Sequence, residues 1–380
     1  ITMNGACRAI SRFFINLVRA AGIWSLHIEG IKAFALSVFS IQHQFDIISY
    51  HIKTQIMSTT MKALRLILEY PGGVPKLVLE DVLKPTLRLK HLVVKVYASA
   101  IHPSDVLNSK GGFPYTTFPR VPGRDFSGIV VEGPSDRIGE EIYGTSGNTI
   151  AFTEDGFQAE YCLVPENAVA PKPKSLSFTQ AACVGVPFTT ASLMLSRAHA
   201  KKGETVLVIG ANGAVGSAIV QLAKSMGCRV LSATRSDNDD INTATDPELK
   251  AVDSLTAGKG IDVVADTVGQ PLLVKAAINK LARGGRLSFI AAPRAGADTG
   301  LTLDMLSFYR GEKSLVGCNT LAYGAEELAV QLKEMAEIFE KGLLKGAEEG
   351  SWTEIKLQNG VEAYEKASER KAGKFVIVMN

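Results

Sequence analysis

Residues 205–234 read Thr-Val-Leu-Val-Ile-Gly-Ala-Asn-Gly-Ala-Val-Gly-Ser-Ala-Ile-Val-Gln-Leu-Ala-Lys-Ser-Met-Gly-Cys-Arg-Val-Leu-Ser-Ala-Thr. The apolar, β-branched run 205–209 is typical of a buried parallel strand. It stops at glycines, after which apolar residues recur at helical spacing, at Val215, Ile219, Leu222 and Ala223. A second apolar run at 229–233 follows within the length of a β-α-β unit. The stretch therefore predicts a strand, a tight turn, a helix and a second strand.

The turn carries three glycines at the spacing of a dinucleotide-binding loop: Gly210, Gly213 and Gly216. We interpret Gly210 as permitting the turn, Gly213 as letting the backbone approach a pyrophosphate, and Gly216 as letting the helix pack tightly on the strand. The free N–H groups and the positive dipole end of the helix favour phosphate oxygens. The alternative is a β-α-β turn that binds nothing, and the second strand makes it the weaker reading.

The residues that end the second strand indicate which dinucleotide is bound. Sites for NAD usually place an acidic residue here for the ribose 2′-hydroxyl, whereas NADP sites need a cation for the 2′-phosphate. The strand ends in Thr234-Arg235-Ser236, and arginine grips phosphate bidentately, so NADPH is favoured. Two alternatives stay open. Arg235 is a solvated surface charge, or the ribose is reached by one of three nearby acids, Asp237, Asp239 or Asp240.

Length and composition place the chain among ordinary globular proteins. Its 380 residues predict two domains, or one domain with an extension. With 46% hydrophobic and 21% charged residues and a net charge of +3, nothing argues for a nucleic-acid partner. Neither a disulfide framework nor a structural zinc knuckle is expected, and a reducing compartment fits, because the five cysteines are widely scattered: Cys7, Cys162, Cys183, Cys228 and Cys318.

Residues 1–60 differ from the rest of the chain. They mix apolar runs with several cations and contain few acids before Glu29, a pattern compatible with an amphipathic targeting segment. An artefactual extension is an equal alternative, since Met57 and Met61 each precede a plausible fresh start. A transmembrane span is not expected, because charged residues interrupt every window of about 20 residues. The expected fold therefore concerns the residues after this segment.

Beyond Met61 the pattern predicts two kinds of domain. Short strands punctuated by Gly and Pro predict a β-rich, barrel-like unit: residues 62–68, 92–98, 127–131 and 161–164. After about Pro187 strands and helices alternate, which predicts a doubly wound α/β sheet: strands at 261–265 and 286–291 with a helix at 272–281 between them. Residues 238–251 are too short and polar for a full strand-helix unit, so we expect that part of the sheet to be irregular. A helix at 325–341 and a final strand at 374–379, returning to the first domain, complete the expectation.

Several phrases make residues 61–379 similar to the medium-chain dehydrogenase/reductase superfamily. They are Pro122-Gly123-Arg124-Asp125-Phe126-Ser127-Gly128, Gly156-Phe157-Gln158-Ala159-Glu160-Tyr161, Thr190-Ala191, Asp262-Val263-Val264 and Gly373-Lys374. The resemblance implies a GroES-like catalytic domain, residues 61–186 and 320–380, and a Rossmann domain, residues 187–319. It implies an active site in the cleft between them.

Within that superfamily the chain resembles the zinc-free branch of quinone oxidoreductases, zeta-crystallins and enoyl reductases. Where the zinc-dependent alcohol dehydrogenases have metal ligands, this chain has His102, Arg124 and Val186, and only His102 could bind a metal. An arginine cation opposes zinc, and a catalytic zinc wants three protein ligands. The phrase His102-Pro103-Ser104-Asp105 and Leu107 depart from the Asn-Pro-x-Asp/Glu phrase and nearby aromatic residue typical of that branch.

The resemblance implies transfer of hydride from NADPH to a quinone or an α,β-unsaturated carbonyl, with no metal. Conjugation in such acceptors spreads the developing negative charge to an oxygen, where hydrogen-bond donors stabilise it. The candidate donors are Ser104 and His102, followed by Asn148 and Tyr143. A packed histidine and a turn-stabilising serine are the structural alternatives. The rival functions are a zinc-type alcohol dehydrogenase and a non-catalytic NADPH-binding or redox-sensing protein.

The resemblance also implies the cofactor contacts. Beside the three glycines they are Thr190, Asn212, Ala214, Val215, Arg235, Ser236, Val268, Gly269, Ala291, Ala292, Asn319 or its neighbour Cys318, and Lys374. Ligands of open α/β sheets bind outside the carboxyl ends of the strands, which is where the strand-end positions in this set fall. The remaining expectations are a small-molecule substrate, a possible homodimer, no membrane span, and a cytoplasmic location, or a mitochondrial one if residues 1–60 are a transit segment.

Overall fold

The computed structural model describes residues 59–293, 297–348, 350–369 and 373–379. The chain divides into two compact units, Ile1–Thr60 and Met61–Asn380. The expected extension at residues 1–60 lies almost wholly outside the described residues. The second unit holds both of the domains that the sequence predicts.

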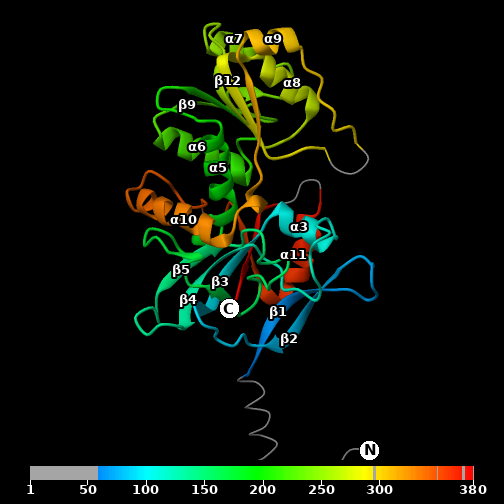
Figure 1. The fold of residues 1–380 in the computed structure, drawn as a ribbon, viewed down its shortest axis with the longest axis vertical. Coiled ribbons are helices and arrows are strands. Elements are labelled where there is room, and N and C mark those ends of the chain that lie inside the picture. Colours follow the sequence, from blue (N-terminus) through cyan, green and yellow to red (C-terminus); the bar gives the residue numbers. More distant parts are fainter. Residues whose placement is uncertain (1–58, 294–296, 349, 370–372, 380) are drawn as a thin grey trace, which may run out of the picture. The chain divides into compact units, whose positions relative to one another are not determined.

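A six-stranded parallel sheet forms around the strand that opens the glycine turn (Figure 1). Its strands run in the order β10, β9, β8, β11, β12, β13, the order of a doubly wound dinucleotide fold. Their bounds are β8 Thr205–Ile209, β9 Arg229–Thr234, β10 Ile241–Asn242, β11 Ile261–Asp266, β12 Leu281–Phe289 and β13 Ser314–Gly317. The predicted fold class is confirmed, and the switch point of the strand order lies between β8 and β11.

Helices cover both faces of this sheet, which explains why β8 is apolar throughout. Alternate residues of a strand point to opposite faces. Val206 and Val208 belong to a core cluster with residues of α5 and α6, whereas Leu207 and Ile209 belong to one with residues of α8. The helices here are α5 Gly185–Arg197, α6 Ala214–Ser225, α7 Ala251–Leu255, α8 Pro271–Asn279 and α9 Met305–Arg310.

The edge of the sheet beyond β9 is irregular, as the sequence predicts. Strand β10 has two residues and α7 has five, where a full unit would hold a complete strand and helix. Asp237, Asp239 and Asp240 fold the chain back there through hydrogen bonds to neighbouring side chains. Hydrogen bonds of these polar side chains therefore hold this edge of the sheet, where a complete strand and helix would supply apolar packing.

The second sheet is largely antiparallel and lies in the lower part of Figure 1. Its order is β14, β15, β3, β4, β5, β7, with β6 also paired to β3, and β1 and β2 form a separate two-stranded ribbon. The bounds are β1 Thr60–Ile67, β2 Lys76–Leu83, β3 His91–Ile101, β4 Asp125–Glu132, β5 Glu141–Thr145, β6 Tyr161–Pro165, β7 Val169–Pro171, β14 Thr353–Lys356 and β15 Phe375–Val378. The last strand pairs with β3, so the predicted return of the chain to the first domain is confirmed.

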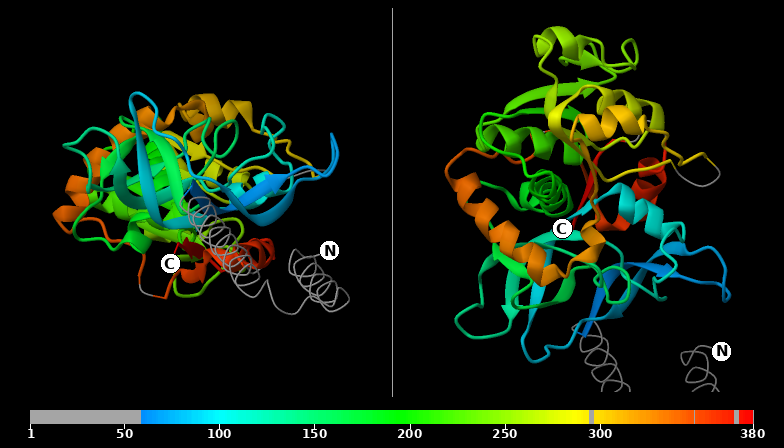
Figure 2. Two further views of the ribbon diagram at one scale, coloured as in Figure 1. Left: turned by 90° about the horizontal axis from the view of Figure 1, so that it is seen from below. Right: turned by 45° about the horizontal axis from the view of Figure 1, so that its top comes forward.

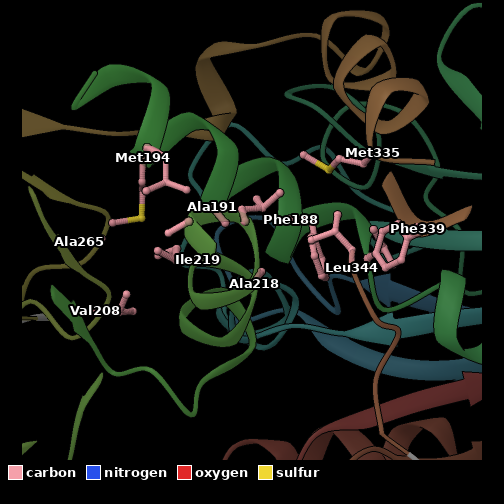
Figure 3. Packing of buried hydrophobic residues seen from close by; sticks show 14 of the residues in the cluster. Phe188, Ala191, Met194, Val208, Ala218, Ile219, Ala265, Met335, Phe339 and Leu344 are labelled. Carbon is pink, nitrogen blue, oxygen red and sulfur yellow. The ribbon is translucent and has the colours of Figure 1, made fainter. Parts of the chain in front are cut away.

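The remaining helices connect the two sheets or cover the second one. They are α3 Pro103–Ser109, α4 Phe178–Ala181, α10 Ala325–Glu340 and α11 Gly360–Ala367, with the 3-10 turns η1 Thr320–Ala322 and η2 Leu357–Asn359. Helix α11 lies beside α3 (Figure 2). Phe339 of α10 contacts Phe188 of α5, with ring centroids 5.2 Å apart (Figure 3). For the domain limits we keep residues 61–186 with 320–380, and residues 187–319, as a proposal.

Candidate active site

The glycine turn between β8 and α6 leaves the N-terminal end of α6 open. Gly210 has a φ of +82°, which glycine adopts without strain. A Cβ on Gly216 would overlap the carbonyl oxygen of Gly210, so the helix packs directly on the turn. Gly213 is the N-cap of α6 and supplies no side-chain cap, so the N–H groups of the first turn stay available for an anion.

A cavity of about 710 Å³ lies at this helix end. Asn212 and Ala214 of the turn line it, as does Lys374, which precedes β15. The Lys374 ammonium donates to the carbonyl oxygen of Asn212 at 3.2 Å, and burial lowers its pKa. An open helix end with a lysine beside it matches the charge of a dinucleotide's phosphates, so these residues fit the cofactor that the turn predicts.

The next turn along the sheet is held by a buried acid. Asp266 ends β11, and its carboxylate accepts the backbone N–H groups of Val268 and Gly269 at 3.0 and 2.9 Å. Burial raises the pKa of Asp266. Gly269 has a φ of +71°, and a Cβ there would overlap the backbone of Ala291, which adjoins Ala292. The structure thus brings these four predicted cofactor positions, 268, 269, 291 and 292, together at the carboxyl end of the sheet.

The loop after β9 presents an arginine while its acids bond to the loop itself. Asp239 accepts the Thr234 hydroxyl at 2.6 Å, and Asp240 accepts the Ser232 hydroxyl at 2.9 Å. Arg235 is exposed, and no hydrogen bond or ion pair within the described residues holds it. The backbone N–H of Ser236 donates to Thr234. A free guanidinium therefore stands where the sequence predicts recognition of a 2′-phosphate.

A buried polar cluster connects α3, β4 and α5. His102 Nε2 lies 2.7 Å from Asp125 Oδ2, and the same oxygen accepts the N–H of Val186 at 2.6 Å. The backbone N–H of His102, the residue before α3, donates to the carboxylate of Asp105 in the first turn of that helix at 2.8 Å. His102, Asp105 and Asp125 are at most 2% exposed. The His102 ring also meets Trp352 edge to face, with centroids 6.0 Å apart, and Trp352 lines the cavity.

Arg124 joins this cluster and is itself buried. Its Nε donates to the Ser146 hydroxyl at 2.9 Å, and its Nη1 donates to the Ser104 hydroxyl at 3.1 Å. The guanidinium carbon lies 5.5 Å from the centre of the Phe152 ring, in cation–π distance. Its third nitrogen, Nη2, is buried and has no hydrogen-bond acceptor among the described residues.

Burial sets the charge states of the cluster. Desolvation raises the pKa of Asp105 to about 6, against the opposing pull of His102 and Arg124. Desolvation alone would lower the pKa of His102, but the charge and hydrogen bond of Asp125 outweigh it and the pKa is raised. Desolvation lowers the pKa of Arg124, although Asp105 and Asp125 support its charge. A histidine with a raised pKa and a buried arginine thus share the cluster with two acids.

The other predicted residues are placed less directly. Thr190 is buried on α5, Val215 is half-buried on α6, and Asn319 is exposed and caps η1. Asn148 is exposed. Tyr143, a predicted donor, is fully buried, and its hydroxyl donates to the Leu332 carbonyl at 2.6 Å. Because that hydroxyl is already bonded to the backbone in the core, we leave Tyr143 out of the proposed site.

The donor set of the cluster does not fit a catalytic zinc. Such a zinc takes three protein ligands, whereas in this cluster the one histidine and the two acids are hydrogen-bonded to one another and an arginine cation lies beside them. The backbone N–H of Val186 donates to Asp125 Oδ2, and the valine side chain supplies no metal ligand. Across the described ranges, no three His, Cys, Asp or Glu side chains are grouped as metal ligands.

Two further observations concern the described chain as a whole. None of its helices combines the length and the apolar character that crossing a membrane requires. Its cysteines are all free thiols: Cys162, Cys183, Cys228 and Cys318.

The fold and the site define a class of protein: an oxidoreductase that uses a nicotinamide dinucleotide and is built from a Rossmann domain and a GroES-like domain. Two family comparisons agree. Residues 214–337 match the family described as zinc-binding dehydrogenase, and residues 89–174 match the alcohol dehydrogenase GroES-like domain. The chain belongs to the medium-chain dehydrogenase/reductase superfamily, in its quinone oxidoreductase-like branch.

Individual relatives cover the same part of the chain. A zinc-type alcohol dehydrogenase-like protein of Schizosaccharomyces pombe is 45% identical, over 84% of this chain and 98% of the relative. A quinone oxidoreductase of Rattus norvegicus is 28% identical, over 85% of this chain and 100% of the relative. Among solved structures, an alcohol dehydrogenase superfamily protein of Novosphingobium aromaticivorans is 25% identical, with a TM-score of 0.72, over 84% of this chain and 100% of that one.

Sequence reasoning missed several members of the buried cluster. From the sequence, Arg124 is only an obstacle to zinc, and Ser146, Phe152 and Trp352 carry no signal of their own. The signal for Arg124 is a charge placed directly before the apolar strand β4, where a solvated side chain is not expected. The others lie on separate segments, and no local pattern connects them to His102.

Proposed function

We propose that this protein is an NADPH-dependent reductase of quinones or α,β-unsaturated carbonyls that works without a metal. The observation that carries the proposal is the buried guanidinium of Arg124, which lies in the polar cluster where the zinc-dependent relatives of the superfamily would need a ligand. A cation of the protein itself then takes the place of a Lewis acid. The quinone oxidoreductase of Rattus norvegicus, as named, supports the same substrate class.

The proposed cofactor contacts follow the carboxyl edge of the parallel sheet. The open end of α6, at Gly213, and Lys374 would hold the pyrophosphate. Arg235 would bind the 2′-phosphate, because it is exposed and unpaired while the neighbouring acids bond to the loop. Gly269 and Ala291 would leave room for the nicotinamide, because Gly269 has no side chain and the two backbones can therefore pack directly on each other.

Bound NADPH supplies a hydride, and the residues of this chain orient the acceptor and stabilise the charge that develops on it. The proposed donors are Ser104 and His102, which the structure brings within one cluster around Arg124 and Asp125. The Ser104 hydroxyl accepts from Arg124, which leaves its own O–H free to donate. Donors fixed in advance in a dry site stabilise an oxyanion more than mobile water does.

Two other functions remain as alternatives. The Schizosaccharomyces pombe relative is named a zinc-type alcohol dehydrogenase-like protein, but the donor set described above disfavours zinc in this chain. A protein that binds NADPH without turnover is the second alternative. A homodimer and a cytoplasmic location, with the mitochondrion as the alternative, stay predictions.

The test is an absorbance assay of NADPH oxidation against a panel of quinones, enones and simple ketones. The proposal expects turnover with quinones or enones and little with ketones, which lack conjugation. NADPH binding without oxidation by any acceptor would favour the non-catalytic alternative. Preference for simple alcohols and ketones would favour the alcohol dehydrogenase.

A further inference from the structure

Unsatisfied buried polar atoms concentrate beside the candidate donors. Within the described residues, four buried side-chain atoms lack a hydrogen-bond partner, and three of them are Arg124 Nη2, Asp125 Oδ1 and Thr145 Oγ1. Asp125 and Thr145 are directly paired across β4 and β5, so the three atoms belong to neighbouring residues at one end of two strands. Leaving a buried donor or acceptor unpaired costs about 1–3 kcal/mol, more for a charged group. Arg124 Nη2 and the Thr145 hydroxyl are donors that an acceptor oxygen of a ligand would satisfy, whereas Asp125 Oδ1 is itself an acceptor.

The guanidinium of Arg124 is fixed in orientation by its other contacts. Two of its nitrogens are bonded, to Ser146 and Ser104, and its face lies over Phe152. A planar fork held at two points leaves the third nitrogen in one direction. Nη2 is therefore a preorganised, charged donor with no acceptor among the residues that the structure describes.

Aromatic side chains adjoin this donor. The rings of Phe113 and Tyr115 lie 5.2 and 5.3 Å from the ring of Phe152, and they contact each other edge to face. Phe152 is fully buried, whereas Tyr115 is 45% exposed. An exposed tyrosine ring near a fixed cation suits a flat, conjugated molecule that carries an oxygen.

We infer that Arg124 is a catalytic residue, whose Nη2 donates a hydrogen bond to the carbonyl oxygen of the conjugated acceptor. The inference rests on the proposed function and names the group that replaces the metal. Hydride from NADPH forms a C–H bond at the β-carbon, the π electrons move to the carbonyl oxygen, and NADPH becomes NADP⁺. Arg124 stabilises the resulting enolate oxygen and keeps its own proton. Water then gives a proton to the α-carbon, which yields the saturated carbonyl compound and leaves hydroxide for the buffer to neutralise.

Ser146 is a positioning residue in this scheme, and Ser104 positions the guanidinium in addition to its proposed role as a donor. They hold Nη1 and Nε, so that the remaining nitrogen points to a single site. Because Ser146 acts only through the guanidinium, replacing it should matter only while Arg124 is present.

The experiment compares acceptors of different intrinsic reactivity in the Arg124→Gln and Arg124→Lys variants. An electron-poor quinone holds negative charge without much help, whereas an enone depends on the donor. We expect kcat of Arg124→Gln to fall about 100-fold or more with the enone, and clearly less with the quinone. The kcat of Arg124→Lys, which keeps the charge but loses the planar fork of donors, should lie between those of wild type and Arg124→Gln. The NADPH affinity of both variants, measured by fluorescence titration, should stay within about twofold of wild type.

The control is Arg283→Gln, which removes an exposed arginine paired with Glu312 and should leave all rates unchanged. An equal loss with every acceptor in both Arg124 variants, or no loss in either, would overturn the inference while leaving the proposed function intact. A wild-type protein that reduces no acceptor would instead remove the proposed function, and the inference with it. Thermal unfolding identifies a variant that has lost its fold. If Arg124→Gln is unfolded, the rates of Arg124→Lys test the inference.

Discussion

At the scale of single residues, Asp105 shows how burial controls protonation. It is 1% exposed, and desolvation raises its pKa to about 6. The folded chain therefore holds this proton more tightly than the unfolded chain does. The stability that results is complete below about pH 4 and is lost as the pH rises to about 6. His102, whose pKa is also raised, acts in the same direction at higher pH.

Asp105→Asn should remove the part of this pH dependence that comes from the acid. The amide oxygen can still accept the N–H of His102, but no buried charge forms. We expect the free energy of unfolding of the variant, relative to wild type, to rise by on the order of 2 kcal/mol between pH 4 and pH 7. Urea unfolding at both pH values measures it, with the exposed acid variant Asp136→Asn as control. A difference that does not change with pH would contradict the assignment.

Arg235 is predicted to select the cofactor. Arg235→Ala removes the free guanidinium and should weaken NADPH about 10-fold or more, a loss of roughly 1.4 kcal/mol. NADH, which carries no 2′-phosphate, should be affected little. Fluorescence titration with both cofactors measures the two dissociation constants. Equal losses would count against the phosphate assignment.

At the scale of elements, Gly269 couples two strand ends of the parallel sheet. It has a φ of +71°, and a Cβ would overlap the backbone of Ala291. Gly342, after α10, has nearly the same φ, +70°, with nothing within reach of a Cβ. Comparing alanine variants at the two positions therefore separates the stability cost of backbone strain from that of the steric contact.

Gly342→Ala should cost about 1 kcal/mol of stability, because only the left-handed backbone is strained. Gly269→Ala should cost clearly more and should also weaken NADPH, because Ala291 and Ala292 must move. Urea unfolding and cofactor titration of both variants measure the effects. Equal stability losses, with NADPH affinity unchanged in both, would show that the contact with Ala291 is unimportant.

Elements with a strong local pattern could be predicted from the sequence. Strand β8, helix α6 and strand β9 follow from apolar periodicity around the glycines, and the final strand from its apolar run. Short strands could not: β7 has three residues, and β13 has no fully buried residue. The pattern also missed β2, whose residues are only partly buried or exposed.

The candidate site was harder to predict than the fold, because its bonds connect distant segments. The pair of His102 with Asp125 spans 23 positions, and the bond from Val186 to Asp125 spans 61. Neither periodicity nor local spacing encodes such contacts. The resemblance indicated the right segment at His102 and Ser104, but only the structure shows that Arg124 bonds to Ser104 and retains a free donor.

At the scale of the whole described unit, two sheets with separate tasks are joined by helices. The parallel sheet presents the turn and loops proposed to hold the dinucleotide, and the antiparallel sheet carries the polar cluster. Helix α5 connects them, since the N–H of Val186 at its start bonds Asp125 and its later residues pack against α6. Residues from both parts line the cavity beside Trp352. We propose that hydride transfer takes place where these two parts meet, beside an arginine cation in place of a metal.

The most direct test measures NADPH oxidation with an enone before and after treatment with a strong zinc chelator, together with the zinc content of the purified protein. The account predicts a zinc content well below one ion per chain, an unchanged rate after chelation, and no gain when zinc is added back. A rate that falls on chelation and returns with stoichiometric zinc would contradict it.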